Sequence, residues 1–536
     1  MLRASEWSAV HRCYGSPVPV NSTHGEYDAS ASAWSRARDV LAGEDAVKAG
    51  GERYLPRLDS QSEEEYSAYR SRAAFFNATA RTSDGYIGLI FRRAPFVKIP
   101  DGPSAPTSSG VRNALAQFVN DADMHGTSLY GYAKNVVNQV IGVGRAGTLI
   151  DWEGDFENRV YASLYCAEQI INWKIERVNG RNLPTRIVLK ESVVRGSAAQ
   201  ATDEFVEDMV EQIRVLELVQ SPELAVVGEN APKPSFVCQV QIWQPKEGKK
   251  KTAKAEWVLT ETRTPLRLGK PLPLLPFVFH GPRHSQPAPD RLPLGDIMAV
   301  NLDHYRLDAD YKHGCHFTAL PTAWVSGFDK TATLRIGSSS AWVSETTGAT
   351  AGFLEFTGQG LTTFERAMDR DERLMAVLGS RLLESQKRVG ETAQAIELRQ
   401  SGENSILANV ATSVSESLTQ VMRWAYWWNS TEEIPELVTD GQVLLELNTD
   451  FSTSGMTSDE LKAIVAAWQA GAISQDTMLE LFRKGEILPD GRTIQAEAAL
   501  IAGKAKPIAG SGPAQATPPA GGAALVPASG PAKMAA

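Results

Sequence analysis

The sequence predicts an α+β protein in which helices and strands occupy separate stretches of the chain. Helical spacing of apolar residues is found in residues 34–95 and 111–141, whereas short strand-like runs separated by turn residues fill 161–280. Residues 361–428 then hold two long helical patterns with a short break between them. Segregation of the two kinds of element, rather than strict alternation, is typical of the α+β class.

The composition indicates a large folded protein of two to four domains. The chain has 536 residues, of which 43% are hydrophobic, and this is enough for a sizeable core. Its formal charge of −9 argues against a DNA binder wrapped in basic surface. The same charge leaves a local basic ring or groove open, so it does not decide whether the protein contacts nucleic acid.

The cysteines and the apolar runs bear on the compartment. The cysteines are far apart and form no C-x-x-C pair: Cys13, Cys166, Cys238 and Cys315. They fit buried free thiols in a reducing compartment better than a disulfide framework, so we expect synthesis and assembly in a cytoplasm. No signal peptide is visible, and the most apolar run, 271–279, is too short and too proline-rich to span a bilayer. No membrane partner is therefore predicted.

The N-terminal region is predicted to be mainly helical. Ser62 and Glu65 have the spacing of a capping box at the start of a helix. The apolar residues that follow share one face, for which core packing is favoured over a base-stacking platform: Tyr66, Tyr69, Ala73 and Phe76. Beyond a link rich in Pro, Gly and Ser at 101–110, further helices are expected over 111–124 and 128–141.

Residues 142–147 form a literal G-x-G-x-x-G. The dinucleotide-binding fingerprint requires a strand before the glycines and a helix after them, so that phosphate meets a helix N-terminus. Here an apolar helix precedes the glycines, and the strand-like residues 147–152 follow. We therefore interpret the glycines as a helix C-cap and turn, with nucleotide binding as the alternative.

Residues 161–280 predict an antiparallel β-rich region, because short strand-like runs alternate there with glycine, proline and charged turns. The basic run 246–254 lies between two of these strand-like runs. A solvated hairpin tip is therefore favoured over a DNA contact for this run.

A long helix is expected from Leu294 to Phe317. Its buried stripe has helical spacing: Met298, Leu302, Tyr305 and Ala309. The same segment carries residue types that bind zinc: His304, Asp308, His313, Cys315 and His316. Their spacing matches no zinc site beyond one i, i+4 pair, so exposed polar residues are favoured and no metal is predicted. A small module of short strands between glycine turns then follows: TAWVSG, TATLRIGSS, AWVSET and GFLEFT.

Two long helices meet at a short break within 361–428. The first carries an apolar stripe that only Asp371 interrupts: Leu361, Phe364, Met368, Met375, Leu378 and Leu382. The second repeats the pattern with Ser417 as its interruption: Leu407, Val410, Val414, Val421, Trp424 and Trp428. Between the helices, Gly390 is a natural helix stop and Thr392 a possible N-cap, so a loop is expected there. A plain helical corner with solvated charges is the alternative.

The C-terminal part begins with a strand-like run, QVLLELNTDF. Two short helices are then expected, with Ser458 and Ser474 as N-caps. From about residue 503 onward, Ala, Gly, Pro and Ser dominate. This tail is expected to be poorly ordered alone, or to become ordered as an arm against a neighbour.

In this order of elements, the chain resembles a tailed-bacteriophage portal (head-tail connector) protein, of the short-tailed phage type often described only as a domain of unknown function. The resemblance covers about residues 34–490 and rests on an ordered set of stretches: GGERYLPRL, EYSAYRSRAAFFNATART, NLDHYRLDAD, LMAVLGSRLLE, GETAQAIELRQSGENSILANVATSVSESL and MTSDELKAIVAAWQAGAISQDTMLELFRKGEIL. It implies a portal-type fold with an α-rich wing, a two-helix stem, a small α/β clip, a long spine helix and a helical crown.

The resemblance also implies a division of the chain. By order, the N-terminal wing region, α-rich and then β-rich, is 1–293; the stem helices are 294–317 and 361–385; the clip is 318–360; the tunnel loop is 386–390; the wing spine helix and strand are 391–454; the crown is 455–490; and an Ala/Gly/Pro-rich tail is 491–536.

The implied function is a homo-oligomeric ring, typically of twelve subunits, at the portal vertex of the capsid in the virion. Such a ring is the channel for double-stranded DNA in packaging and ejection, and it contacts the major capsid protein, the terminase large subunit and a tail adaptor protein. DNA must slide through it, so tight or sequence-specific contacts would be a defect. The residues expected to face the DNA in the tunnel loop are Gln386, Lys387 and Arg388.

No catalytic residue, metal or cofactor is predicted, and the protein is not expected to be an enzyme. The chain has no G-x-x-x-x-G-K-[ST], H-E-x-x-H or G-x-S-x-G. The packaging motor is therefore expected to be a separate terminase subunit. Two alternatives from other classes are a nucleotide-binding multidomain enzyme using 142–147 and a capsid-interior scaffold protein without a pore.

Overall fold

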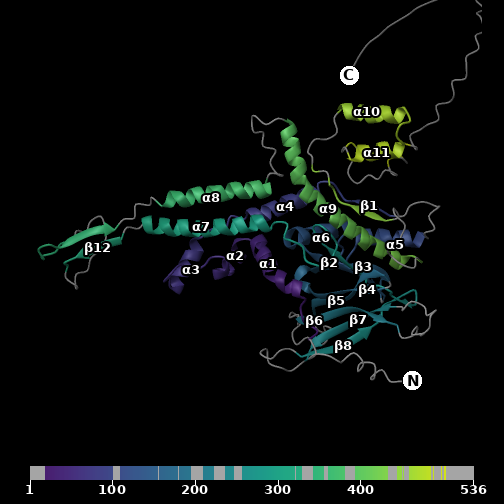
Figure 1. Ribbon diagram of the computed structural model, residues 1–536, viewed down its shortest axis with the longest axis horizontal. Coiled ribbons are helices and arrows are strands. Elements are labelled where there is room, and N and C mark those ends of the chain that lie inside the picture. Colours follow the sequence, from purple (N-terminus) through teal and green to yellow (C-terminus); the bar gives the residue numbers. More distant parts are fainter. Residues whose placement is uncertain are drawn as a thin grey trace, which may run out of the picture. The chain divides into compact units, whose positions relative to one another are not determined.

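Figure 1 shows a computed structural model of the chain, which divides into two compact units, Met1–Phe451 and Ser452–Ala536. Helices and antiparallel sheets together make an α+β fold, as the sequence predicts. The structure describes residues 19–99, 109–154, 156–178, 180–194, 209–221, 236–246, 256–319, 322–328, 342–354, 360–380, 393–431, 443–449, 451, 458–484, 487, 497 and 500–501.

The N-terminal region is helical. Its helices are α1 (Gly25–Ala42), α2 (Glu44–Ala49), α3 (Glu63–Arg72) and α4 (Ala78–Ile90), with a short 3₁₀ turn at Gly51–Arg53. The predicted capping box is confirmed, because Ser62 Oγ accepts from Glu65 N at 3.2 Å and Glu65 Oε2 accepts from Ser62 N at 2.8 Å. The acidic first turn of α3 adds a favourable interaction with the helix dipole.

Replacing Ser62 with alanine is expected to lower the free energy of unfolding by about 1 kcal/mol, because the amide of Glu65 loses its cap. Ser67→Ala is the matched control, since Ser67 is an exposed serine inside the same helix. Alanine has the higher helix propensity there, so this variant is expected to be neutral or slightly stabilising. Urea unfolding followed by circular dichroism would compare the two, and equal losses would contradict the capping role.

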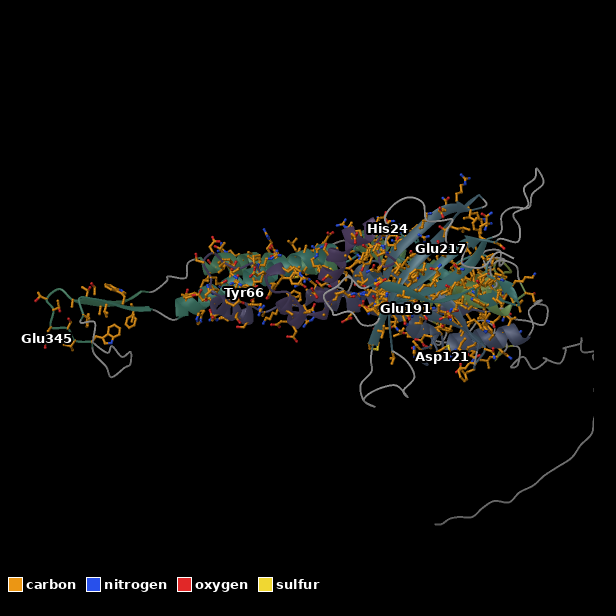
Figure 2. All side chains as sticks on the ribbon, turned by 90° about the horizontal axis from the view of Figure 1, so that it is seen from below. His24, Tyr66, Asp121, Glu191, Glu217 and Glu345 are labelled. Carbon is orange, nitrogen blue, oxygen red and sulfur yellow. The ribbon has the colours of Figure 1, made fainter. Side chains whose placement is uncertain are left out.

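One part of the predicted N-terminal core is wrong. Tyr66, Tyr69 and Ala73 are buried, but Phe76 is 42% exposed. Helix α3 ends at Arg72, so the helical spacing that would place Phe76 on the buried face no longer applies. Tyr66 lies among the packed side chains of this helical region (Figure 2), and its hydroxyl donates to the carbonyl of Leu55 at 2.8 Å.

Two further helices precede the sheets, and both predictions are confirmed with shifted ends. They are α5 (Ser109–Asn120) and α6 (Leu129–Val143), and a short strand, β1 (Phe96–Lys98), lies before them. Ser128 caps α6, with its Oγ accepting from Gly131 N at 3.3 Å. Helix α5 was expected to reach residue 124 but ends at Asn120, and Met124 and Gly126 adopt positive φ in the turn that follows.

The β-rich region is antiparallel, as predicted. A three-stranded sheet has the order β11-β2-β3, formed by β2 (Ala146–Glu153), β3 (Arg159–Cys166) and β11 (Phe277–His280). A five-stranded sheet has the order of the chain: β4 (Ile170–Val178), β5 (Arg181–Val194), β6 (Met209–Gln220), β7 (Phe236–Pro245) and β8 (Trp257–Arg263). Strands β9 (Leu266–Arg267) and β10 (Lys270–Pro271) form a small pair.

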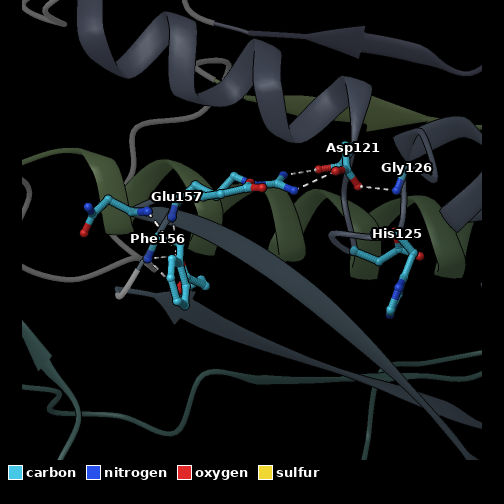
Figure 3. Close-up of polar contacts among 9 residues, drawn as sticks. Asp121, His125, Gly126, Phe156 and Glu157 are labelled. Carbon is cyan, nitrogen blue, oxygen red and sulfur yellow. Dashed lines mark hydrogen bonds and ion pairs between the residues drawn. The ribbon is translucent and has the colours of Figure 1, made fainter. Parts of the chain in front are cut away.

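Two connections between strands of these sheets have described side-chain contacts. Strands β7 and β8 pair antiparallel and Lys246 Nζ lies 3.3 Å from Glu256 Oε2, which fits the predicted hairpin; residues 247–255 lie outside the described residues. In the turn between β2 and β3, the Glu153 carboxylate accepts from the amides of Phe156, Glu157 and Asn158 (Figure 3). This turn holds Phe156 in a fixed position with 91% of its surface exposed.

Two helices, α7 and α8, form an antiparallel pair, and the chain between them contains a small two-stranded sheet. Helix α7 (Gly295–Ala319) leads to β12 (Thr322–Ser326), which pairs antiparallel with β13 (Thr350–Leu354) before α8 (Leu361–Met375) returns along α7 (Figure 1). The strand expected at AWVSET is wrong for its described residues 342–346, which lie outside any strand. The predicted strand TATLRIGSS lies outside the described residues.

Helix α9 (Ala393–Asn429) contributes to the main hydrophobic core from Leu407 onward, and its predicted stripe is confirmed. All six apolar stripe residues and Ser417 are buried. Polar side chains of α9 also bond to neighbouring elements: Ser413 Oγ donates to Gly281 O at 2.8 Å, and Ser415 Oγ accepts from Leu447 N at 2.9 Å. Strand β14 (Leu444–Glu446) lies next to α9 and pairs with β1.

The second unit contains α10 (Ser458–Gln469) and α11 (Gln475–Lys484). Ser474 Oγ accepts from Thr477 N at 3.1 Å, which confirms the predicted cap of α11. Helix α10 begins at Ser458 itself, so this residue belongs to the first helical turn rather than preceding it. The predicted tail beyond residue 501 lies outside the described residues.

Candidate functional site

The predicted tunnel-loop residues Gln386, Lys387 and Arg388 lie outside the described residues. The structure describes the segments that flank this loop: α8 and its continuation end at Ser380, and α9 begins at Ala393. The candidate site is therefore built from the α7–α8 pair, whose second helix precedes the predicted loop, and from the contacts that fix this pair.

The two helices are held in one antiparallel register along their length. Near one end, a Cβ added to Gly314 would lie 2.7 Å from Leu361 Cδ2, so the helices approach closely there. One turn away, Tyr311 hydroxyl donates to Glu365 Oε1 at 2.9 Å. These contacts align α7 and α8 residue by residue.

The register continues to the other end. His304 Nε2 lies 3.5 Å from Glu372 Oε1, and Gly379 packs against Ile297. From Ile297 to Gly314, each step forward along α7 therefore faces a position one residue earlier on α8, over about five turns of helix.

The C-terminal end of α8 departs from regular helix. Residues Ala376–Ser380 form a π-helical turn, which is wider than an α-helical turn. As a result Met375 and Gly379 face the interior, whereas Leu378 is 43% exposed. The prediction that Leu378 belongs to the buried stripe is wrong, because it assumed an unbroken α-helical period.

The remaining stripe of α8 is only partly confirmed. Leu361, Phe364 and Met368 are half-buried, and Leu382 lies outside the described residues. Asp371, the expected interruption, is 2% exposed and faces inward. Its Oδ1 lies 3.5 Å from Arg370 Nη2, and its Oδ2 has no hydrogen-bond partner among the described residues.

Helix α7 is fixed to the N-terminal helices by buried polar contacts. Asn301 Oδ1 accepts from Thr79 Oγ1 at 2.8 Å, and Asn301 Nδ2 donates to Phe76 O at 2.7 Å. Asp308 Oδ2 accepts from Ala74 N at 2.6 Å. Burial is costly for such groups unless they are paired, so these bonds define where α7 sits.

Three of the five residues considered as zinc ligands contact other groups. Asp308 also pairs with Lys312 at 3.1 Å, His313 packs edge-on against Tyr69, and the His316 ring lies 3.3 Å from Arg72 Nη2. Among the described residues, no group of three or more His, Cys, Asp or Glu side chains is placed to hold a metal ion.

The outer surface of α8 carries charges of both signs and one apolar strip. Its exposed charged residues are three acids and three arginines: Glu365, Arg366, Asp369, Arg370, Glu372 and Arg373. The apolar strip consists of Leu374, Val377 and Leu378, which are each about two-fifths exposed. Sequence periodicity missed this strip, because Leu374 and Val377 lie off the predicted stripe and Leu378 was placed inside.

The segment 142–147 cannot cradle a phosphate. Gly144, at φ 75°, ends α6, and strand β2 begins at Ala146, which confirms the predicted C-cap and turn. Every residue from 141 to 150 is buried, and a Cβ on Gly147 would meet the ring of Phe277. The glycines serve close packing, and the nucleotide-binding alternative at this place is wrong.

Arg145 within the same segment is an internal packing residue. It is 1% exposed, its guanidinium lies 4.0 Å from the Trp173 ring centre, and Nη2 donates to Pro287 O at 2.6 Å. Burial lowers the pKa of Arg145 to about 9. The side chain is therefore held between aromatic rings rather than presented to a ligand.

The described cysteines are free: Cys238 is buried, and Cys166 and Cys315 are partly buried. Burial raises the pKa of the Cys238 thiol to about 12 and so keeps it in the unreactive protonated form. None of the described helices combines the length and apolar character needed to cross a membrane.

A comparison with known protein families gives a match to the segment from α7 to α9. A family described as Domain of unknown function (DUF4055) matches residues 293–429, which span α7 to α9. No curated protein matches the sequence.

Several solved structures are similar over much of the chain. The neck of a native GTA particle computed with C12 symmetry has 9% identity and a TM-score of 0.33, covering 82% of this chain and 98% of that chain. The neck of an empty GTA particle computed with C6 symmetry has 11% identity and a TM-score of 0.34, covering 84% and 100%. The virion of a native gene transfer agent (GTA) particle has 11% identity and a TM-score of 0.35, covering 84% and 99%. These TM-scores do not establish a common fold.

Proposed function

We propose that this protein is the portal of a tailed bacteriophage, a ring subunit at one capsid vertex through which double-stranded DNA enters and leaves. The observation that carries the proposal is the order and packing of residues 295–429: an antiparallel helix pair with a small sheet at its turn, followed by the 37-residue α9 in the core. This order supports α7 and α8 as a stem, β12–β13 as part of a clip and α9 as a spine.

A ring of identical subunits needs two different surfaces that fit each other, because head-to-tail contacts must close. The apolar strip of α8 supports one such surface. Leu374, Val377 and Leu378 are exposed beside charged residues of both signs, so a neighbouring subunit could bury the strip and pair the charges. Twelve subunits are expected from the sequence resemblance.

In the proposed channel, Lys387 and Arg388 guide DNA without holding it. The described outer face of α8 carries equal numbers of acids and arginines, so it offers no continuous basic wall that would trap phosphates. Two cations on a loop at the end of this helix would contact the backbone transiently and read no base sequence. The terminase, tail adaptor and major capsid protein would bind other parts of the ring, with the adaptor at the clip.

Electron microscopy of the purified full-length protein tests the ring. Class averages viewed down the particle axis are expected to show a closed ring with a central hole of about 20 Å or more, wide enough for duplex DNA. Monomers or compact dimers, in the presence of capsid and scaffold partners, would refute the portal. Closed particles without a hole would favour a capsid-interior scaffold instead.

Replacing Lys387 and Arg388 with alanine together is expected to change the amount of DNA packaged or retained, while rings still form. The reason is the loss of both loop cations that would contact phosphates. The matched control is Lys134→Ala with Arg177→Ala, which removes two exposed cations from α6 and β4. DNA content of purified particles is the measurement. Normal content and retention in the loop variant would eliminate this role.

A further inference from the structure

A cavity of about 330 Å³ lies between α1, α7 and the 3₁₀ turn Gly51–Arg53. It is lined by three arginines, two side chains that bear hydroxyl groups, and apolar surface: Arg36, Arg53, Arg306, Ser32, Tyr54 and Leu302. Residue patterns could not predict this site, because its residues come from three segments that are far apart along the chain.

Helical spacing explains why these side chains converge. Ser32 and Arg36 are four residues apart on α1, and Leu302 and Arg306 are four residues apart on α7, so each pair shares one helix face. Helices α1 and α7 are in contact, as Figure 1 also shows. Tyr54 and Leu302 are buried and form the inner part of the cavity lining.

The three arginines differ in how far they are already neutralised. Arg53 Nη1 donates to Asp39 Oδ2 and to Ser35 Oγ, both at 3.0 Å. Arg306 Nε donates to the Tyr54 carbonyl at 2.9 Å, which fixes its guanidinium. Its Nη1 lies 4.0 Å from the exposed carboxylate of Asp303, a distance too long for a hydrogen bond.

Arg36 adds a guanidinium group whose positive charge is not paired with an acidic side chain among the described residues. Its exposed side chain has no hydrogen-bond or ion-pair partner among the described residues. One unpaired guanidinium and one weakly paired but oriented guanidinium therefore face the same cavity. Guanidinium groups offer paired donors that match the oxygens of a phosphate, and an anion would be held between α1 and α7.

We propose that this cavity binds phosphate groups, with Arg36 and Arg306 as the principal contacts. Its volume is within the range of small-molecule sites and exceeds the space that one phosphate needs, so a diphosphate or a short run of phosphodiesters fits the same chemistry. The phosphate can come from a free phosphorylated compound or from a nucleic-acid backbone. The proposal concerns the outer face of α1 and α7 and does not depend on the portal assignment.

The test uses the full-length protein and two probes, inorganic pyrophosphate by isothermal titration calorimetry and a short DNA duplex by fluorescence anisotropy. Arg36→Gln is expected to raise the Kd of at least one probe about tenfold or more, because a charge-assisted contact is lost. Arg177→Gln, which removes an exposed arginine of β4, is the matched control and is expected to leave both Kd values unchanged.

The two arms distinguish the sources. Loss of pyrophosphate binding alone identifies a free phosphorylated ligand, whereas loss of duplex binding alone identifies a nucleic-acid backbone; loss of both identifies a general phosphate site. The proposal is overturned if neither probe distinguishes wild type from Arg36→Gln, or if Arg177→Gln weakens binding equally. Circular dichroism would confirm that the Arg36 variant, which removes no described contact, remains folded.

Discussion

Replacing Gly379 with alanine is expected to lower the free energy of unfolding by about 1 to 3 kcal/mol. An added Cβ would lie 2.5 Å from Ile297 Cδ1, 2.5 Å from Thr82 Oγ1 and 2.8 Å from Thr82 Cγ2. Both neighbours are buried, and the Thr82 hydroxyl already donates to Ala78 O at 2.9 Å, so Thr82 has little freedom to move. The π-helical turn of α8 would have to shift away from α4 and α7.

The sign of this effect is what makes the experiment informative. Glycine inside a helix is ordinarily replaced by alanine with a gain of about 0.5 to 1 kcal/mol. Gly88 provides the matched control, because it lies in α4, is exposed and has no atom within 4 Å of an added Cβ. Gly88→Ala is therefore expected to stabilise the protein, as measured by urea unfolding. A stabilising Gly379→Ala would show that α8 does not pack on α4 as described.

The second large effect concerns His280, which is fully buried among β2, β11 and α9. His280 Nε2 lies 2.6 Å from Thr148 Oγ1, and Nδ1 lies 2.7 Å from Ser417 Oγ. Ser417 Oγ donates to Val414 O at 2.9 Å, so it can accept a hydrogen from Nδ1. Thr148 Oγ1 can accept from the Tyr132 hydroxyl at 2.9 Å and then donate to Nε2. This chain is satisfied by a neutral imidazole.

Burial lowers the pKa of His280 from an ordinary value of 6.5 to about 3. The unfolded chain therefore binds a proton between these values while the folded chain does not. Stability from this residue is fully present above pH 6.5 and is lost as the pH falls, with a slope approaching 1.4 kcal/mol per pH unit. Between pH 7.5 and pH 5 the expected loss is about 2 kcal/mol.

His280→Gln is expected to be less stable than wild type at neutral pH, because hydrogen bonds in the buried chain are broken. Its stability should nevertheless fall less steeply with acid, by about 2 kcal/mol over the same interval. His125→Gln is the matched control, since it removes an exposed histidine. Unfolding free energies measured at several pH values give the slopes. Parallel curves for wild type and His280→Gln would contradict the assignment of a neutral buried imidazole.

Residue patterns predicted the parts of the fold that depend on local periodicity. The stripe of α9, the order of helix before strand around Gly144 and the capping box at Ser62 are all present, because each is set by residues within one or two turns of each other. The same reasoning failed for Phe76 and Leu378. In each case a helix ended or changed its period, and neighbouring elements decided where this occurred.

Less of the candidate site could be predicted than of the fold. The helices on either side of the predicted tunnel loop were identified from the sequence, and the loop and its residues remain a prediction. The inward position of Asp371 and the exposed strip at Leu374 and Val377 depend on how α8 rests on α7 and α4. A single-helix pattern ranks positions by apolar character and does not contain this information.

The sequence by itself determined the class of the fold, the positions of most helices and strands, and the resemblance from which the portal proposal comes. These follow from short-range physics, namely side-chain period, capping and turn chemistry. Only the tertiary structure decided that Gly379 is a contact between three helices, that His280 is held neutral, and that Arg36, Arg53 and Arg306 share one cavity. Each of these depends on atoms from segments far apart in the chain, whose approach is set by packing of the whole core.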